Sequence, residues 1–166
     1  MNIVLIGFMG AGKTVVGQQL ARELGYNYLD TDELIEQTAE RSVAQIFKED
    51  GEEYFRVLET EVLITLQDYD GFVLATGGGM VMRPENAALL KTIGSVVLLW
   101  ADPAVLYERV RNETHRPLLK VSDPLAEIER RLAEREPHYR QAADETINTA
   151  GKNPAEIAEE IKKWLK

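Results

Sequence analysis

The stretch Ile3-Val-Leu-Ile-Gly-Phe-Met-Gly-Ala-Gly-Lys-Thr14 decides the fold of this chain. Its apolar, β-branched beginning is typical of a buried strand. Gly7 and the later run Gly12-Lys-Thr14 then fit the spacing G-x-x-x-x-G-K-[ST]. Glycines here let successive backbone N–H groups turn inward, and a helix that begins near Gly12 directs its positive end at the same point. The pattern predicts a nucleoside triphosphate site, with Lys13 on the β- and γ-phosphates and the Thr14 hydroxyl on Mg²⁺.

The composition of the 166 residues predicts one globular domain over residues 1–166. No apolar run is long enough to span a membrane, and no basic leader precedes the first strand, so we expect a cytoplasmic protein without a membrane partner. The absence of cysteine excludes disulfides and thiolate chemistry. A net charge of −9 argues against nucleic acid as a partner and requires that a few well-placed cations hold any anionic ligand.

Two carboxylates follow the second expected strand, at residues 26–29. Asp30 and Asp32 lie at i and i+2, where the carboxyl end of a parallel strand would place them beside the phosphate loop. Such a pair suits Mg²⁺ on one carboxylate and a substrate hydroxyl on the other. The alternative is that an aspartate only caps the next helix, and position alone leaves both interpretations open.

Residues 33–67 are expected to be helical, with breaks near Arg41-Ser42 and Asp50-Gly51. Ser42-x-x-Gln45 fits a capping box. The apolar side chains predicted to face inward after it are Val43, Ile46 and Phe47.

This helical insertion is too long for a plain crossover between the second and third strands, so residues 33–61 form a candidate substrate-binding subdomain. Arg56 lies beside an apolar stripe on its last helical part. A solvated or ion-paired surface arginine is the alternative to a ligand-binding one.

Three glycines, Gly77 to Gly79, follow the expected strand at residues 72–75. Glycines after a buried strand expose backbone N–H groups to close approach by a ligand, and a flexible turn is the alternative. Asp68-x-x-Gly71 resembles a GTPase switch motif, but it precedes the strand, and the chain contains no N-K-x-D motif. A GTPase is therefore excluded.

The segment from residue 111 to residue 123 is basic and lacks periodicity. Between helices of a phosphate-loop protein, it predicts a mobile lid that carries Arg116, and an ordinary solvated loop is the alternative. His115 and His138 have no metal-ligand spacing and are interpreted as structural.

Further apolar runs complete a three-layer α/β fold with a parallel sheet of about five strands between helices. The expected strands are residues 3–6, 26–29, 72–75, 96–100 and 146–148.

Taken together, these landmarks resemble the shikimate kinase family from end to end. The motifs that carry the resemblance are Gly7-Phe-Met-Gly-Ala-Gly-Lys-Thr14, Asp30-Thr-Asp32, Phe47 with Gly51-Glu52 and Phe55-Arg56, Gly77-Gly-Gly79, Arg116-Pro-Leu-Leu119, Arg135-Glu-Pro-His-Tyr139 and Asn153-Pro154. The resemblance implies transfer of the ATP γ-phosphate to the 3-hydroxyl of shikimate, with ATP and Mg²⁺ as cofactors. By likeness to nucleoside monophosphate kinases, it also implies the strand order 2-3-1-4-5.

The site residues are carried over from the family by position. The implied nucleotide-binding residues are Gly10, Ala11, Gly12, Lys13, Thr14, Val15, Arg109, Arg116 and Lys152. The implied shikimate-binding residues are Asp32, Arg56, Gly77, Gly78, Gly79 and Arg135. The implied metal-binding residues are Thr14 and, through water, Asp30. The implied catalytic residues are Lys13, Asp32 and Arg116.

In this scheme Asp32 takes the proton of the attacking hydroxyl, and a loose transition state needs no raised pKa at Asp32. Arg56 and Arg135 clamp the carboxylate of shikimate, since guanidinium groups bind carboxylates bidentately. Arg116 reaches the phosphates from the lid, and Arg109 lies against adenine. The core, the helical insertion and the lid are expected to move relative to one another.

The chain departs from the family pattern at Val15, where a second hydroxyl is frequent, and at Lys152, where an arginine is frequent. We expect a monomer. Two other functions remain open: a kinase for a nucleoside monophosphate or sugar acid, and a nucleotide-binding module without catalysis. Arg56 and Arg135 could hold a phosphate as readily as a carboxylate.

Overall fold

A five-stranded parallel sheet lies at the centre of the computed structural model, which describes residues 1–113 and 120–166. The strands lie in the order β2-β3-β1-β4-β5, which confirms the predicted α/β fold and strand order. Their bounds are β1 Ile3–Ile6, β2 Asn27–Asp30, β3 Phe72–Ala75, β4 Ser95–Trp100 and β5 Glu145–Asn148.

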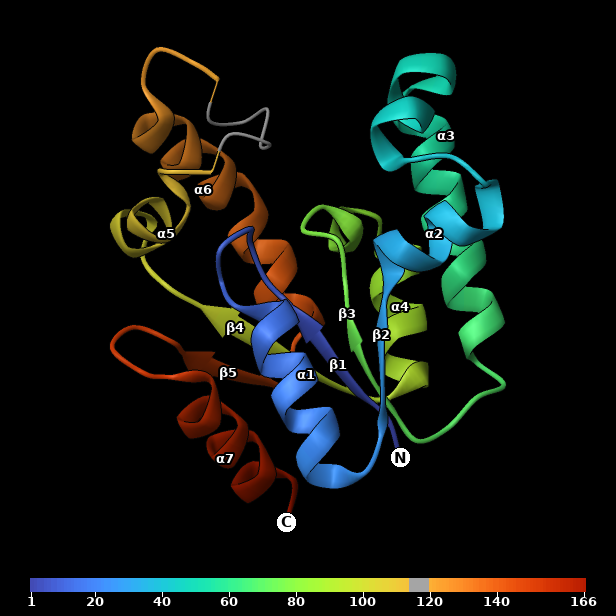
Figure 1. Ribbon diagram of the computed structural model, residues 1–166, viewed down its shortest axis with the longest axis vertical. Coiled ribbons are helices and arrows are strands. Elements are labelled where there is room, and N and C mark those ends of the chain that lie inside the picture. The colour runs from blue at the N-terminus through green and yellow to red at the C-terminus, as the bar shows by residue number, and fades with distance from the viewer. Residues whose placement is uncertain (114–119) are drawn as a thin grey trace.

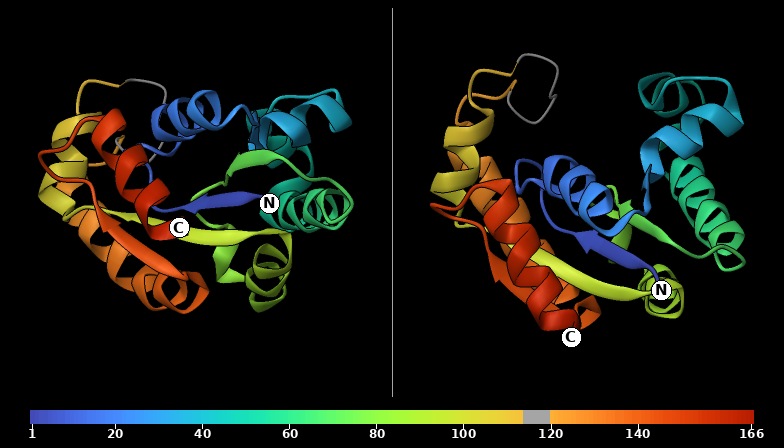
Figure 2. Two further views of the ribbon diagram at one scale, coloured as in Figure 1. Left: turned by 90° about the horizontal axis from the view of Figure 1, so that it is seen from below. Right: turned by 60° about the horizontal axis from the view of Figure 1, so that its bottom comes forward.

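Helices cover both faces of the sheet (Figure 1). They are α1 Lys13–Leu24, α2 Thr31–Ala39, α3 Val43–Leu66, α4 Pro84–Ile93, α5 Pro103–Val110, α6 Pro124–Ala142 and α7 Pro154–Leu165, with a 3₁₀ helix η1 at Met80–Met82. Figure 2 shows α1 and α7 on one face and α4 and α6 on the other. None of the helices in the described ranges is long and apolar enough to cross a membrane.

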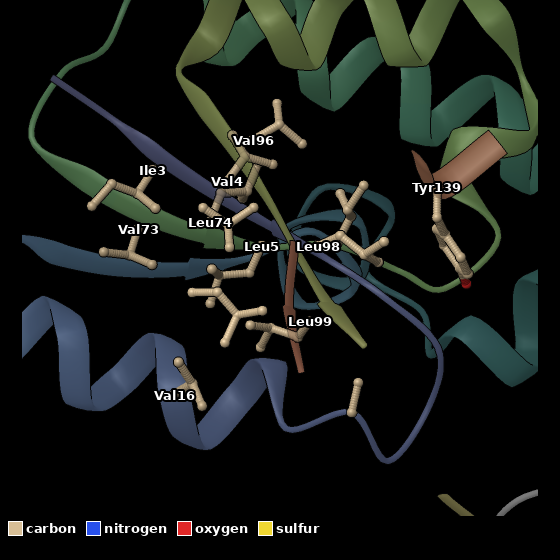
Figure 3. Close-up of a cluster of buried hydrophobic side chains, with 14 of the residues drawn as sticks. Ile3, Val4, Leu5, Val16, Val73, Leu74, Val96, Leu98, Leu99 and Tyr139 are labelled. Atoms are coloured by element: carbon tan, nitrogen blue, oxygen red, sulfur yellow. The ribbon is translucent and has the colours of Figure 1, made fainter. Parts of the chain in front are cut away.

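The core lies on the central strands, which are apolar on both faces because helices cover both. Val4 pairs with Leu74 of β3 and with Val96 of β4, and all three side chains are fully buried. These strands contribute most of the labelled side chains in Figure 3. The parallel register brings the carboxyl ends of β1, β2 and β3 to one edge of the sheet.

Local signals place the helix boundaries. Proline occupies the first turn of α4, α5, α6 and α7, where its missing N–H costs no hydrogen bond. Gly25 ends α1 in the left-handed conformation, with φ 69°, as its position in the sequence predicts.

The helical insertion breaks at both predicted points. Glu40 ends α2 with φ 54°, and Ser42 and Gln45 form the capping box that begins α3. Gly51 has φ 87° and ψ 171° inside α3, so the helix is interrupted there. Arg41 forms salt bridges just before this interruption, with Glu49 at 2.8 Å and with Asp50 at 2.6 Å.

The expectation for Phe47 is wrong. Ile46 is buried, as predicted, but Phe47 is 39% exposed and lies at the wall of a cleft. Its ring packs against that of Phe55, with centroids 4.9 Å apart. The short first part of α3 has only one side directed at the core, so adjacent positions 46 and 47 cannot both face inward.

Candidate active site

A cleft of about 710 Å³ lies at the carboxyl edge of the sheet. In Figure 1 this edge faces the space between the α2–α3 side and the α5–α6 side. The predicted site residues that line the cleft are Gly10, Ala11, Gly12, Lys13, Thr14, Val15, Asp30, Asp32, Arg56, Gly77, Gly78, Gly79, Arg109, Arg135 and Lys152. Arg116 and the rest of the predicted lid between residues 114 and 119 lie outside the described residues.

The phosphate loop joins β1 to α1. Gly7 has φ 151°, and a side chain there would meet the carbonyl of Leu99 at 2.6 Å, so only glycine fits. Gly12 precedes α1 with φ 100° and provides no side-chain cap, so the first N–H groups of the helix can bind an anion. The Lys13 ammonium donates to the carbonyl oxygen of Gly7, which holds it at the loop.

Asp30 fulfils the capping role that the sequence leaves open. Its Oδ1 accepts from the backbone N–H of Asp32 at 2.8 Å and of Glu33 at 3.3 Å, which begins α2. Asp30 still lines the cleft, as Thr14 does. Capping and metal binding are compatible, because Mg²⁺ takes one or two protein ligands and completes its shell with water and phosphate oxygens. No preformed cluster of three or more metal-ligating side chains occurs in the described ranges.

Asp32 points into the cleft. Its Oδ1 is buried and has no hydrogen-bond partner among residues 1–113 and 120–166. Burial first, and then the charge of Asp30, raise the pKa of Asp32, while Lys13 and Arg56 oppose the shift. A buried oxygen without a partner suits a group that receives a hydrogen bond from a substrate.

The absence of side chains at Gly77 to Gly79 lets charged side chains of the cleft approach the backbone closely. A side chain at Gly77 would meet the carboxylate oxygens of Glu59 at 3.1 Å and Asp32 at 3.2 Å. At Gly78 it would meet Arg135 Nη1 at 3.2 Å, and at Gly79 it would meet Arg56 Nη2 at 2.6 Å. The turn thus lies directly against charged groups of the cleft.

Two of the three backbone N–H groups in this turn remain for a ligand. The N–H of Gly77 donates to the buried hydroxyl of Thr31 at 3.0 Å. No hydrogen bond within the described residues uses the N–H of Gly78 or Gly79. Of the three predicted backbone contacts with the substrate, those of the Gly78 and Gly79 N–H groups therefore remain available.

Arg56 is an ion-paired arginine as well as a cleft residue. Its Nη1 donates to Glu59 Oε1 at 2.7 Å, and Nη2 lies 3.3 Å from Glu52. Glu59 is fully buried, and burial raises its pKa to about 7 although Arg56 opposes the shift. Glu59 was not among the site residues predicted from the sequence. The available signal is a glutamate on the apolar stripe of α3 between Phe55 and Leu63, three residues after an arginine.

The raised pKa of Glu59 predicts how stability depends on pH. Between its ordinary pKa of 4.5 and about 7, the folded chain holds a proton that the unfolded chain has released. The free energy of unfolding should therefore fall as pH rises through this window, by up to about 3 kcal/mol. In Glu59→Gln this contribution disappears. Urea unfolding at pH 5, 6, 7 and 8 measures the difference.

The matched control is Glu61→Gln, an exposed site on the same helix, which should keep the pH dependence of the unchanged chain. Identical slopes in Glu59→Gln and Glu61→Gln would contradict the raised pKa.

Arg135 on α6 lies over the ring of Phe8, with its guanidinium carbon 5.3 Å from the centroid. Among the described residues no carboxylate lies within 4.0 Å of its nitrogens. Its charge is therefore available for an anionic ligand, whereas that of Arg56 is partly neutralised.

At the far end of the cleft, Arg109 connects the phosphate loop to the loop that follows β5. It donates to the carbonyls of Gly10 at 3.0 Å and Thr149 at 3.0 Å. Lys152 pairs with Glu160 at 2.8 Å. The contact of Arg109 with adenine and the part of Lys152 in nucleotide binding remain predictions.

Comparison with known proteins decides the family. The shikimate kinase family model matches residues 9–166. The chain belongs to the shikimate kinase family. Its relatives include the shikimate kinase of Caldanaerobacter subterraneus subsp. tengcongensis, 48% identical over 96% of this chain and 93% of that protein. The shikimate kinase of Symbiobacterium thermophilum is 46% identical over 99% and 96% of the two chains.

Solved structures of the family agree. The shikimate kinase from Acinetobacter baumannii, in complex with shikimate, has a TM-score of 0.92 at 39% identity and covers 99% of this chain and 92% of its own. A gluconokinase from Sinorhizobium meliloti, at 18% identity and a TM-score of 0.57, shares the fold alone. The predicted family is confirmed, and with it an ATP-dependent kinase.

Proposed function

We propose that this cleft is the active site at which the chain transfers the γ-phosphate of ATP to the 3-hydroxyl of shikimate. One observation carries the proposal: Arg56, Arg135 and the Asp32 carboxylate all lie against the Gly77–Gly79 turn beside the phosphate loop. A small hydroxy acid seated on this turn would have its carboxylate held by two guanidinium groups. One of its hydroxyls would then meet Asp32.

Positive charge around the migrating phosphoryl group comes from Lys13 and the N-terminus of α1. We assign Arg116 the same role from the lid, as the family pattern implies. Thr14 and Asp30 would hold Mg²⁺, which when bound neutralises charge on the β- and γ-phosphates. The capped, cleft-facing carboxylate of Asp30 fits this assignment.

Asp32 receives the proton. In a loose transition state the bond to the leaving phosphate oxygen breaks early, so the attacking hydroxyl becomes acidic late and gives its proton to the Asp32 carboxylate. Arg56 and Lys13 favour the ionised form of Asp32 that accepts this proton.

Closure of the cleft excludes water, which would otherwise compete as a nucleophile. We assign substrate binding to the insertion at residues 33–61 and lid function to residues 111–123. The helix interruption at Gly51 and the left-handed Glu40 are points at which the part of the insertion between them can turn relative to the rest of the chain.

A coupled ADP-release assay tests the proposal. We expect turnover with ATP and shikimate that requires Mg²⁺, and none above background with AMP, CMP or gluconate. Faster turnover with any of these three would assign a different acceptor. Tight ATP binding without turnover on any of the four would instead favour a module without catalysis.

A further inference from the structure

Tyr139 joins α6 to the glycine turn. Its side chain is 1% exposed, and its hydroxyl donates to the carbonyl oxygen of Gly78 at 2.5 Å. In Figure 3 the ring lies at the margin of the buried apolar side chains. Burial raises the pKa of Tyr139, so the hydroxyl remains a donor at neutral pH. The bond connects segments 61 residues apart.

This bond fixes the direction of a ligand-facing amide. The peptide unit between Gly78 and Gly79 is planar and trans, so the N–H of Gly79 points opposite to the carbonyl of Gly78. Glycine on both sides permits many orientations of this plane. With the carbonyl held by Tyr139, the N–H of Gly79 is directed away from α6, and it has no partner within the described residues.

Tyr139 and Arg135 both lie beside Gly78. Tyr139 and Arg135 are four residues apart on α6 and therefore share a face. A side chain on Gly78 would lie 3.2 Å from Arg135 Nη1 and 3.7 Å from the Tyr139 hydroxyl. The turn, the hydroxyl and the guanidinium thus form one contiguous unit.

We propose that Tyr139 is a positioning residue for the acceptor: its hydroxyl orients the Gly78–Gly79 peptide so that the Gly79 amide and the Arg135 guanidinium bind one hydroxy acid together. The inference rests on the proposed function, because the acceptor is the shikimate assigned to this cleft. Tyr139 touches no reacting atom, so its effect should fall on acceptor binding.

Tyr139→Phe removes the hydroxyl and keeps the ring. One neutral hydrogen bond contributes about 0.5–1.5 kcal/mol, so we expect the KM for shikimate to rise about 2- to 13-fold. The kcat and the KM for ATP should stay within about twofold, since the phosphate loop is untouched. In protein labelled with ¹⁵N-glycine, which has twelve glycines to assign, the Gly79 amide resonance should shift.

Asn2→Ala separates positioning from plain stability. Asn2 bonds the carbonyls of Tyr69 at 3.0 Å and Ile93 at 3.1 Å, near the opposite edge of the sheet. This variant should lower Tm while the KM for shikimate stays unchanged.

Three results would overturn the inference. A normal KM for shikimate in Tyr139→Phe, with active unchanged protein, rejects the positioning role and leaves the proposed function standing. Equal increases in both KM values reduce Tyr139 to a structural residue. An unchanged protein that does not phosphorylate shikimate rejects both proposals.

Discussion

Asp32→Asn should lose turnover by about 10²- to 10⁴-fold, the usual contribution of a general base. The amide occupies the same space and can still bond the acceptor hydroxyl, but it cannot take the proton. ATP should bind as before, because the phosphate loop and α1 are unchanged. Steady-state assays and calorimetric titration with ATP measure the two effects separately.

The thermal stability of Asp32→Asn should not fall with its turnover. Because burial raises the pKa of Asp32, the ionised carboxylate is unfavourable in the folded chain at neutral pH, and the neutral amide removes that cost. We therefore expect Asp32→Asn to keep or raise Tm while turnover collapses. Asp70→Asn, on an exposed aspartate that pairs with the N-terminus, is the chemical control and should turn over normally. Near-normal turnover in Asp32→Asn would remove the assigned role.

Arg56→Ala should raise the KM for shikimate by about 10- to 150-fold, equivalent to about 1.5–3 kcal/mol for hydrogen bonds to a charged group. The KM for ATP should change far less. Steady-state kinetics with each substrate varied in turn measure the ratio. Equal changes in both KM values would place Arg56 outside the acceptor site.

The variant Arg56→Ala also affects stability through the buried Glu59. It leaves the Glu59 carboxyl buried without its partner at 2.7 Å. Near pH 7 to 8 this should cost about 3–5 kcal/mol of stability, because the folded chain must bury the charge or take up a proton that the unfolded chain has released. In Arg56→Ala combined with Glu59→Gln, the stability should largely return while the KM for shikimate stays high. Arg22→Ala, on an exposed arginine of α1, is the control and should alter neither property.

Much of the fold could be predicted because its signals are local. The apolar run at residues 96–99 marks a strand buried on both faces, and it lies inside β4. Gly25, Pro84 and the Ser42–Gln45 capping box mark helix ends by backbone conformations and hydrogen bonds within a few residues. The phosphate-loop motif lies within one short stretch of sequence, so the loop could also be predicted from local residues alone.

The site was predicted as a set of residues but not as a network. The resemblance implied Arg56, Arg135 and the glycines at 77 to 79, and the structure brings them into one cleft. It did not indicate that the Gly77 N–H is already bonded to Thr31. The exposure of Phe47 also escaped the pattern, because two adjacent apolar positions on a helix cannot be ranked without knowing what covers them.

By itself, then, the sequence determined the strands, the helix ends, the phosphate loop and the types of charged group available to an anionic substrate. These follow from interactions between residues close in the chain. Only the tertiary structure decided that Glu59 is buried against Arg56 and that the Tyr139 hydroxyl holds Gly78. The burial of Glu59 depends on which segments pack over α3, and the Tyr139 bond joins residues 61 apart, so both are settled by packing between distant segments.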